Sequence, residues 1–82
     1  MNKKKLLRQI INNKKNVRYN DFTALAESFG FILQRSEGSH RMYKHKAVAE
    51  ILNLQSRNGE AKPYQIEYFF GLVEKYNLEM ED

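Results

Sequence analysis

The spacing of apolar residues changes at Gly30, and this change constrains the fold more than any other feature of the sequence. Before Gly30, apolar side chains recur at intervals of three and four residues, which is typical of amphipathic helices. The intervals predict one helix over about 3–13 and another over about 21–29. The stripe expected to face the core from the second helix consists of Phe22, Leu25, Ala26 and Phe29. Gly30 is suited to end that helix in a left-handed conformation.

After Gly30 the apolar runs are short and resemble strands. We expect strands over 31–35, 40–45 and 51–55. Turn residues at 36–39 join the first two strands into a hairpin, and 56–60 is interpreted as a loop. Pro63 suits the first turn of a final helix, because its missing N–H has no helical partner there. The stripe expected to be buried on this helix is Ile66, Phe69, Phe70 and Val73.

The expected order of elements is therefore α-α-β-β-β-α, which indicates an α+β fold. Sequential strands joined by tight turns usually pair antiparallel. Helices with a single apolar stripe cover one face of such a sheet. We predict a three-stranded antiparallel sheet with helices on one face and the other face open to a ligand. A single domain over residues 1–82 is expected, because the chain is short and shows no repeat or linker.

The absence of cysteine excludes several classes of chemistry. It rules out disulfides, thiolate catalysis and cysteine-ligated zinc, so packing alone must stabilise the fold. It also suits a reducing cytoplasm, which is the location we expect. No apolar run approaches the roughly 20 residues of a membrane span, and no signal-peptide core follows the basic N-terminus, so a membrane partner is not expected.

Positive charge is concentrated in the first half of the chain. Residues 1–46 contain eleven Lys or Arg against three acids, a balance of +8, whereas residues 47–82 contain three against seven, a balance of −4. Such asymmetry favours a polyanionic partner, of which nucleic acid is the commonest. An acidic protein, or a charged face that serves solubility alone, fits the charge equally well.

Gly38, Ser39 and His40 lie between the first two expected strands. A histidine has a pKa of about 6.5 and is suited to general acid or base work at neutral pH. In RNA cleavage, a base removes the 2′-hydroxyl proton, an acid protonates the leaving 5′ oxygen, and cations stabilise the phosphate charge. Gly38 would let an RNA backbone approach, and Ser39 can donate a hydrogen bond to phosphate. A histidine at the surface of a strand, with no catalytic role, is the alternative.

Arg35, Arg41 and Lys44 flank this hairpin and are candidates for binding phosphate. Side chains alternate along a strand, so Lys44 shares a face with His40 and Arg41 points the other way. Lys44 is interpreted equally well as a solvated residue of an edge strand that binds no phosphate. His45 is separated from His40 by an odd number of residues, so we expect it on the opposite face, at a solvated strand end. No metal site is expected.

Tyr64 and Gln65 begin the final helix. An aromatic ring at this position could stack on a nucleobase, or it could pack against the sheet. The spacing does not separate these alternatives.

The motifs form an ordered set that covers roughly residues 4–78. They are Gly30-Phe31, Arg35, Gly38-Ser39-His40, Met42-Tyr43-Lys44-His45, Leu52-Asn53-Leu54-Gln55 and Gly59-Glu60-Ala61-Lys62-Pro63-Tyr64-Gln65. In this order they resemble the HicA family, small ribonuclease toxins of bacterial and archaeal toxin–antitoxin pairs. The resemblance implies a fold like a double-stranded RNA-binding domain and metal-independent cleavage of mRNA that halts translation. It also implies an antitoxin partner of the HicB type that blocks the site, and it places the catalytic histidine at His40.

We therefore expect an endoribonuclease toxin that acts on single-stranded mRNA without a cofactor. The expected site has His40 as general acid and base, with Gly38, Ser39, Arg35, Arg41 and Lys44 binding substrate. His40 could serve as base and then as acid, or the leaving-group proton could come from Lys44 or water. A non-catalytic RNA-binding module and an antitoxin-binding protein are the alternatives.

Overall fold

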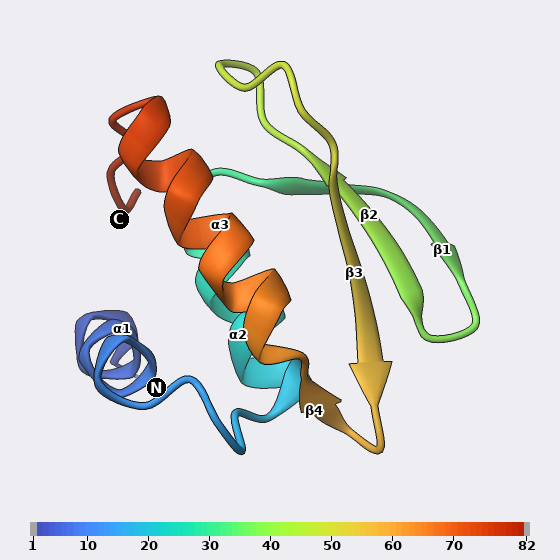
Figure 1. Cartoon of the computed structure of the whole chain (residues 1–82). Helices are drawn as coiled ribbons and strands as arrows, with labels where there is room; N and C mark the ends of the chain where they lie inside the picture. Colours follow the sequence, from blue (N-terminus) through green and yellow to red (C-terminus); the bar gives the residue numbers. More distant parts are fainter. Residues whose placement is uncertain (1, 82) are drawn as a thin grey trace.

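Three helices and four strands make up the chain in a computed structural model, which describes residues 2–81 (Figure 1). The helices are α1 (Lys3–Asn12), α2 (Tyr19–Ser28) and α3 (Pro63–Lys75). The strands are β1 (Ile32–Glu37), β2 (His40–Lys44), β3 (Leu52–Arg57) and β4 (Glu60–Ala61). The expected elements all form, with ends that differ by a few residues from the predicted ones.

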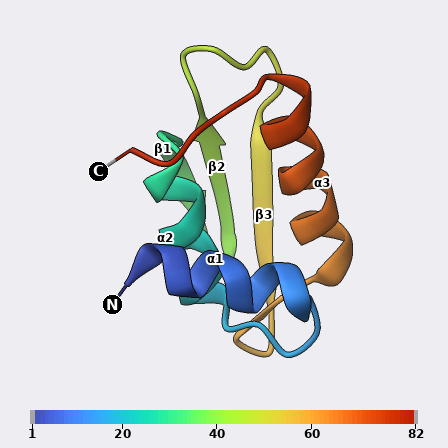
Figure 2. The same cartoon turned by 90° about the vertical axis from the view of Figure 1, so that its left-hand side faces the viewer.

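The helices lie on one side of the sheet, and its other face is open. α2 and α3 pack between the sheet and α1, which crosses their outer side (Figures 1 and 2). The sheet is antiparallel throughout, in the order β1-β2-β3-β4. The predicted α+β class is confirmed, and so is the placement of helices on one face. The predicted number of three strands is wrong, because β4 extends the sheet.

β4 forms because Asn58 and Gly59 make a two-residue turn. Both residues have positive φ, 52° and 81°. Turns of this kind match the twist of paired strands, and Asn-Gly is a strong short-range hairpin signal. Ser56 and Arg57 therefore pair with Ala61 and Glu60. The segment 56–60, which the sequence analysis interpreted as a loop, is a tight hairpin.

The predicted hairpin between β1 and β2 is confirmed. Gly38 has a φ of 57° at the first position of its two-residue turn, and Glu37 pairs with His40. The register shifts between Leu33 and Arg35, so β1 contains a bulge.

The core lies between the sheet and the helices. Alternation along β2 and β3 turns Tyr43, Leu52 and Leu54 inward, where each is 0 % exposed. All four residues of the stripe predicted for α2 are buried. Phe69 of α3 meets the rings of Phe22 and Phe29 edge-on, with ring centroids 5.5 Å apart in each pair. This packing fixes which face of the sheet is covered.

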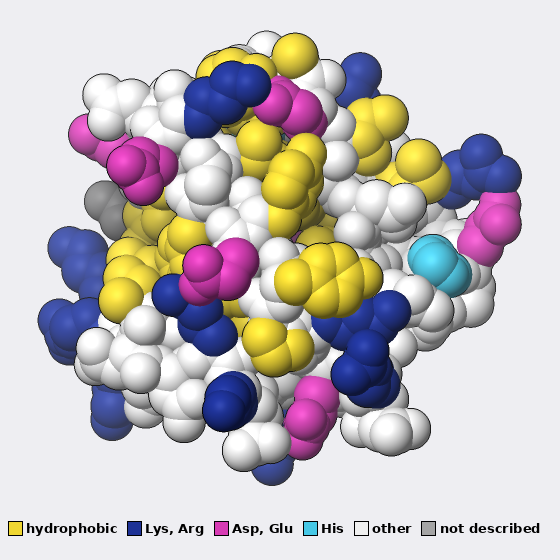
Figure 3. Space-filling model, in the orientation of Figure 1, with side chains coloured by type: hydrophobic (Ala, Val, Ile, Leu, Met, Phe, Trp, Pro, Cys, Tyr) yellow, Lys and Arg dark blue, Asp and Glu magenta, His cyan; other side chains and the backbone are white. Residues whose placement is uncertain are grey.

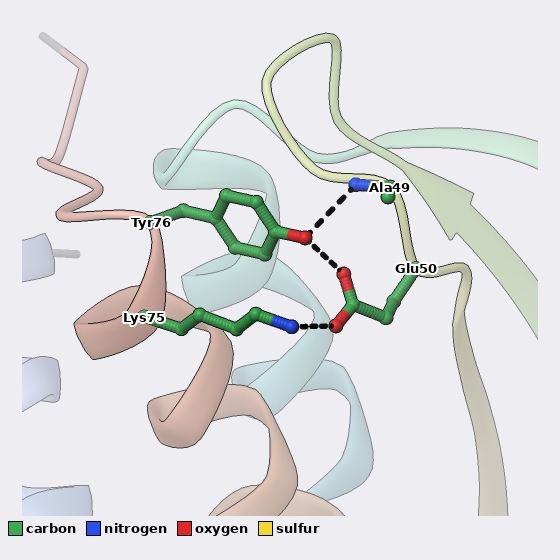
Figure 4. A network of polar contacts seen from close by, with 4 residues as sticks. All are labelled: Ala49, Glu50, Lys75 and Tyr76. Atoms are coloured by element: carbon green, nitrogen blue, oxygen red, sulfur yellow. Dashed lines mark hydrogen bonds and ion pairs between the residues drawn. The ribbon is translucent and has the colours of Figure 1, made fainter.

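A polar network ties the connection between β2 and β3 to the end of α3 (Figure 4). Lys75 Nζ lies 2.8 Å from a carboxylate oxygen of Glu50, and the Tyr76 hydroxyl donates to the other oxygen. These two donors lower the pKa of Glu50 to about 2. The network holds the long connection against the helix. Within residues 2–81, no helix combines the length and apolar character needed to cross a membrane.

Candidate functional site

Alternation along β2 separates its side chains between the two faces of the sheet. His40 and Lys44 are exposed on the open face, and Met42 between them is partly exposed. Tyr43 is buried on the helix side, and Arg41 points the same way. The guanidinium carbon of Arg41 lies 5.3 Å from the centre of the Tyr19 ring. The division expected from strand geometry is confirmed, and it places Arg41 away from His40.

His40 lies where two surface hollows meet. The smaller hollow, about 320 Å³, is on the open face of the sheet, and its lining is Arg35, Glu37, His40, Met42 and Asn53. The larger, about 520 Å³, runs from the sheet to α3, and its lining is His40, Asn53, Gln55, Tyr64, Gln65 and Tyr68. The surface view shows a histidine with hydrophobic and basic groups on one side and an acid–base pair on the other (Figure 3). His40 is therefore accessible to a ligand from both hollows.

Arg35 is the predicted cation that lines the same hollow as His40. Through the register shift it lies opposite Met42, on the open face. Its guanidinium forms an ion pair with Glu37, and both side chains are about two-thirds exposed. Exposed pairs of this kind contribute roughly 0–1 kcal/mol, so Arg35 can exchange the carboxylate for a phosphate at little cost.

Lys44 lies on the same face as His40 but at the far end of β2. Four residues of strand separate the two by about 13 Å along the chain. Lys44 lines neither hollow. The structure therefore brings Arg35 to the surroundings of His40 and leaves Lys44 outside them.

Gly38 and Ser39 form the turn that leads into His40. A side chain on Gly38 would meet no atom within 4 Å, so glycine is required there by its positive φ and not by crowding. The Tyr19 hydroxyl reaches the turn from α2 and lies 3.3 Å from the backbone oxygens of both Ser39 and Leu54. Burial raises the pKa of Tyr19 against the opposing effect of Arg41. A neutral phenol therefore anchors the turn that carries His40.

Glu37 is a site candidate that was expected only as a charge and as part of the turn at 36–39, and it is the last residue of β1. It pairs with His40 across the hairpin and lines the same hollow. A carboxylate beside an imidazole can orient the ring and stabilise its charged form. The signal was present in the sequence, because a two-residue hairpin turn makes the flanking residues cross-strand neighbours.

His45 is buried, and its predicted position at a solvated strand end is wrong. It is 8 % exposed, and its ring lies edge-on to Phe31 with centroids 5.2 Å apart. Its Nδ1 accepts a hydrogen bond from the Ala47 N–H at 3.0 Å. His45 directly follows Lys44, the last residue of β2. Its side chain continues the alternation of the strand and points inward, against Phe31. As expected, His45 does not share a face with His40.

Comparisons with family models, curated proteins and solved structures find no match for this chain. The likeness to the HicA family therefore stays a prediction that rests on the motif residues. Within residues 2–81, no three His, Cys, Asp or Glu side chains are grouped to hold a metal ion.

Proposed function

We propose that this chain is an endoribonuclease toxin of the HicA type, which cleaves single-stranded mRNA without a metal and halts translation. The observation that supports this best is the position of His40, exposed where the two hollows meet and opposite Glu37. A phosphodiester bound at this junction has an acid–base group beside it and Arg35 within the same hollow.

In the proposed reaction, His40 removes the proton from a 2′-hydroxyl, and the 2′ oxygen attacks the adjacent phosphorus. The bond from phosphorus to the 5′ oxygen breaks, and that oxygen takes the proton back from the His40 imidazolium. The products are a 2′,3′-cyclic phosphate and a 5′-hydroxyl. Glu37 stabilises the imidazolium, and Arg35 stabilises the charge on the phosphate oxygens.

The strand geometry favours a single histidine that serves as base and then as acid. Lys44 lies about 13 Å from His40 along the strand, too far to protonate the same leaving group. We assign Lys44 to a phosphate further along the RNA, and Gly38 and Ser39 to the backbone next to the scissile bond. The substrate role predicted for Arg41 has less support, because its side chain lies against Tyr19.

The remaining parts of the proposal concern fold type, partner and location. A sheet with helices on one face agrees with a plan like that of a double-stranded RNA-binding domain, with β4 as an addition. The charge balance of +8 over residues 1–46 suits RNA and also an acidic surface on an antitoxin of the HicB type. We place the protein in the cytoplasm.

The test is a gel assay of the purified chain on several single-stranded RNAs with excess EDTA. The native chain is expected to cleave, and His40→Ala to lose at least about 100-fold in rate with unchanged thermal unfolding. Glu74→Gln, an exposed change on α3, is the matched control and keeps full activity. The chain is purified under denaturing conditions and refolded to exclude bound antitoxin. No cleavage by refolded native chain would reject the proposed reaction.

A non-catalytic RNA-binding module is the second candidate, and the exposed aromatic rings of α3 favour it. In that case RNA binds in a salt-dependent manner, neither the native chain nor His40→Ala cleaves it, and the two bind with equal affinity. A chain that binds no RNA but forms a salt-dependent protein complex is an interaction protein instead.

A further inference from the structure

Tyr64 and Tyr68 form an exposed aromatic pair on α3, next to His40. They are 63 % and 47 % exposed, and both line the larger hollow. Residues four apart lie on the same face of a helix, so both rings lie on the side of α3 that borders the hollow. Neither ring is packed into the core. The alternative that the Tyr64 ring is buried against the sheet is therefore excluded.

The first turn of α3 is held firmly against β3, which gives the hollow a fixed wall. Gln65 is buried, and its Oε1 accepts a hydrogen bond from the Gln55 N–H at 3.1 Å. Lys62 Nζ donates to the Gln55 Oε1 at 2.8 Å, which orients that amide. Lys62 Nζ also lies 5.9 Å from the centre of the Tyr64 ring. The aromatic rings of α3 and the amides of β3 thus line the same hollow.

The lining of the larger hollow differs in kind from that of the smaller one. It contains aromatic rings and side-chain amides but no carboxylate or guanidinium, whereas the smaller hollow contains Arg35 and Glu37. A volume of about 520 Å³ lies within the range of roughly 300–1,000 Å³ that is usual for small-molecule sites. Rings stack on the flat face of a base, and amides form hydrogen bonds with its edge.

We propose that the larger hollow is a nucleobase subsite for the nucleotide next to the scissile phosphate. In this subsite an unpaired base stacks on Tyr64 or Tyr68, and the amides of Asn53 and Gln55 bind its edge. The inference rests on the proposed function, because it takes RNA as the substrate and His40 as the group at the phosphate. It predicts a preference for single strands, since a paired base cannot enter the hollow.

The test uses the native chain and 2′-O-methyl RNA oligonucleotides that carry 2-aminopurine at one position in each. This RNA cannot be cleaved by 2′-oxygen attack, so binding is measured alone. We expect fluorescence quenching at one position when the base stacks. The Tyr64→Ala, Tyr68→Ala double variant should bind about 5- to 150-fold more weakly and lose the quenching. Tyr64→Phe with Tyr68→Phe keeps the rings and retains it. Ile11→Ala, which trims an exposed apolar side chain of α1, is the matched control.

The outcomes separate this inference from the proposed function. In one outcome, cleavage depends on His40, but the double Ala variant leaves binding and quenching unchanged. This outcome overturns the subsite and leaves the proposed reaction supported. Quenching that depends on the tyrosines, without cleavage of ordinary RNA, supports the subsite and overturns the reaction. If the two tyrosines are needed to bind an antitoxin but not RNA, the subsite is also overturned.

Discussion

The two faces of the central strands β2 and β3 differ in exposure and in the kind of side chain that they carry. On the helix side, Tyr43, Leu52 and Leu54 are 0 % exposed. On the open side, His40 and Asn53 are exposed and line the hollows. Because neighbours in sequence lie on opposite faces, residues that stabilise the core alternate with residues that line the surface hollows along the same short strands. Changes on one face should therefore leave the function of the other largely unaltered.

The largest expected effect contrasts two adjacent residues of β3. Leu54→Ala removes a fully buried side chain and should lower the free energy of unfolding by about 2–5 kcal/mol. Asn53→Ala, on the open face, should change it by no more than about 0.5 kcal/mol. Urea unfolding measures both. Equal losses would show that the open face also stabilises the fold.

Tyr19→Phe tests whether the helix face supports the turn that carries His40. It removes the hydroxyl that lies 3.3 Å from the backbone oxygens of Ser39 and Leu54, and should cost about 1 kcal/mol of stability. If the two faces act independently, the RNA cleavage rate of the folded variant is unchanged. A clear drop in cleavage would mean that α2 positions His40.

The same phenol should give stability a dependence on alkaline pH. Burial raises the pKa of Tyr19 above its ordinary value of 10.0. The contribution of Tyr19 to the free energy of unfolding is therefore complete below about pH 10 and is lost as the pH rises toward the pKa of Tyr19 in the folded protein. Part of the loss of stability at alkaline pH should disappear in Tyr19→Phe. The part that remains includes the contribution of Tyr43, because burial also raises the pKa of that residue.

A smaller effect is expected from the cations on either face of β2. Lys44→Ala should reduce the salt dependence of RNA binding by about one unit of slope, because a phosphate contact is lost. Arg41→Ala, on the Tyr19 side, should leave that slope unchanged. Binding titrations at several salt concentrations compare the two. A larger change for Arg41→Ala would contradict the division of β2 into a core face and a ligand face.

The smallest expected effect lies away from both faces, at the partly exposed network of Glu50, Lys75 and Tyr76 (Figure 4). The pKa of Glu50 is lowered from 4.5 to about 2. The stabilisation is therefore present above about pH 4.5 and is lost as pH falls toward 2. Native and Glu50→Gln unfolding curves should differ at pH 7 and converge near pH 2. A constant difference across that range would exclude the ionised carboxylate as its source.

Local patterns predicted much of this fold, and the failures have local causes. The stripe of α2 and the first residue of α3 agree with the prediction. On α3, Phe70 and Val73 are only partly buried, whereas Gln65 and Leu72 are buried. Spacing identifies a helix but not its rotation, which depends on the neighbours it packs against. β4 was missed although Asn58 and Gly59 carried its signal.

The sequence alone determined the order of helices and strands and the alternation that separates His40 from Arg41, because spacing and turn residues act over a few positions. Only the tertiary structure decided which face of the sheet the helices cover. It also placed Tyr64 and Tyr68 beside His40 and buried His45 beside Phe31. Those placements depend on packing between segments far apart in the chain, and local spacing carries no record of such contacts.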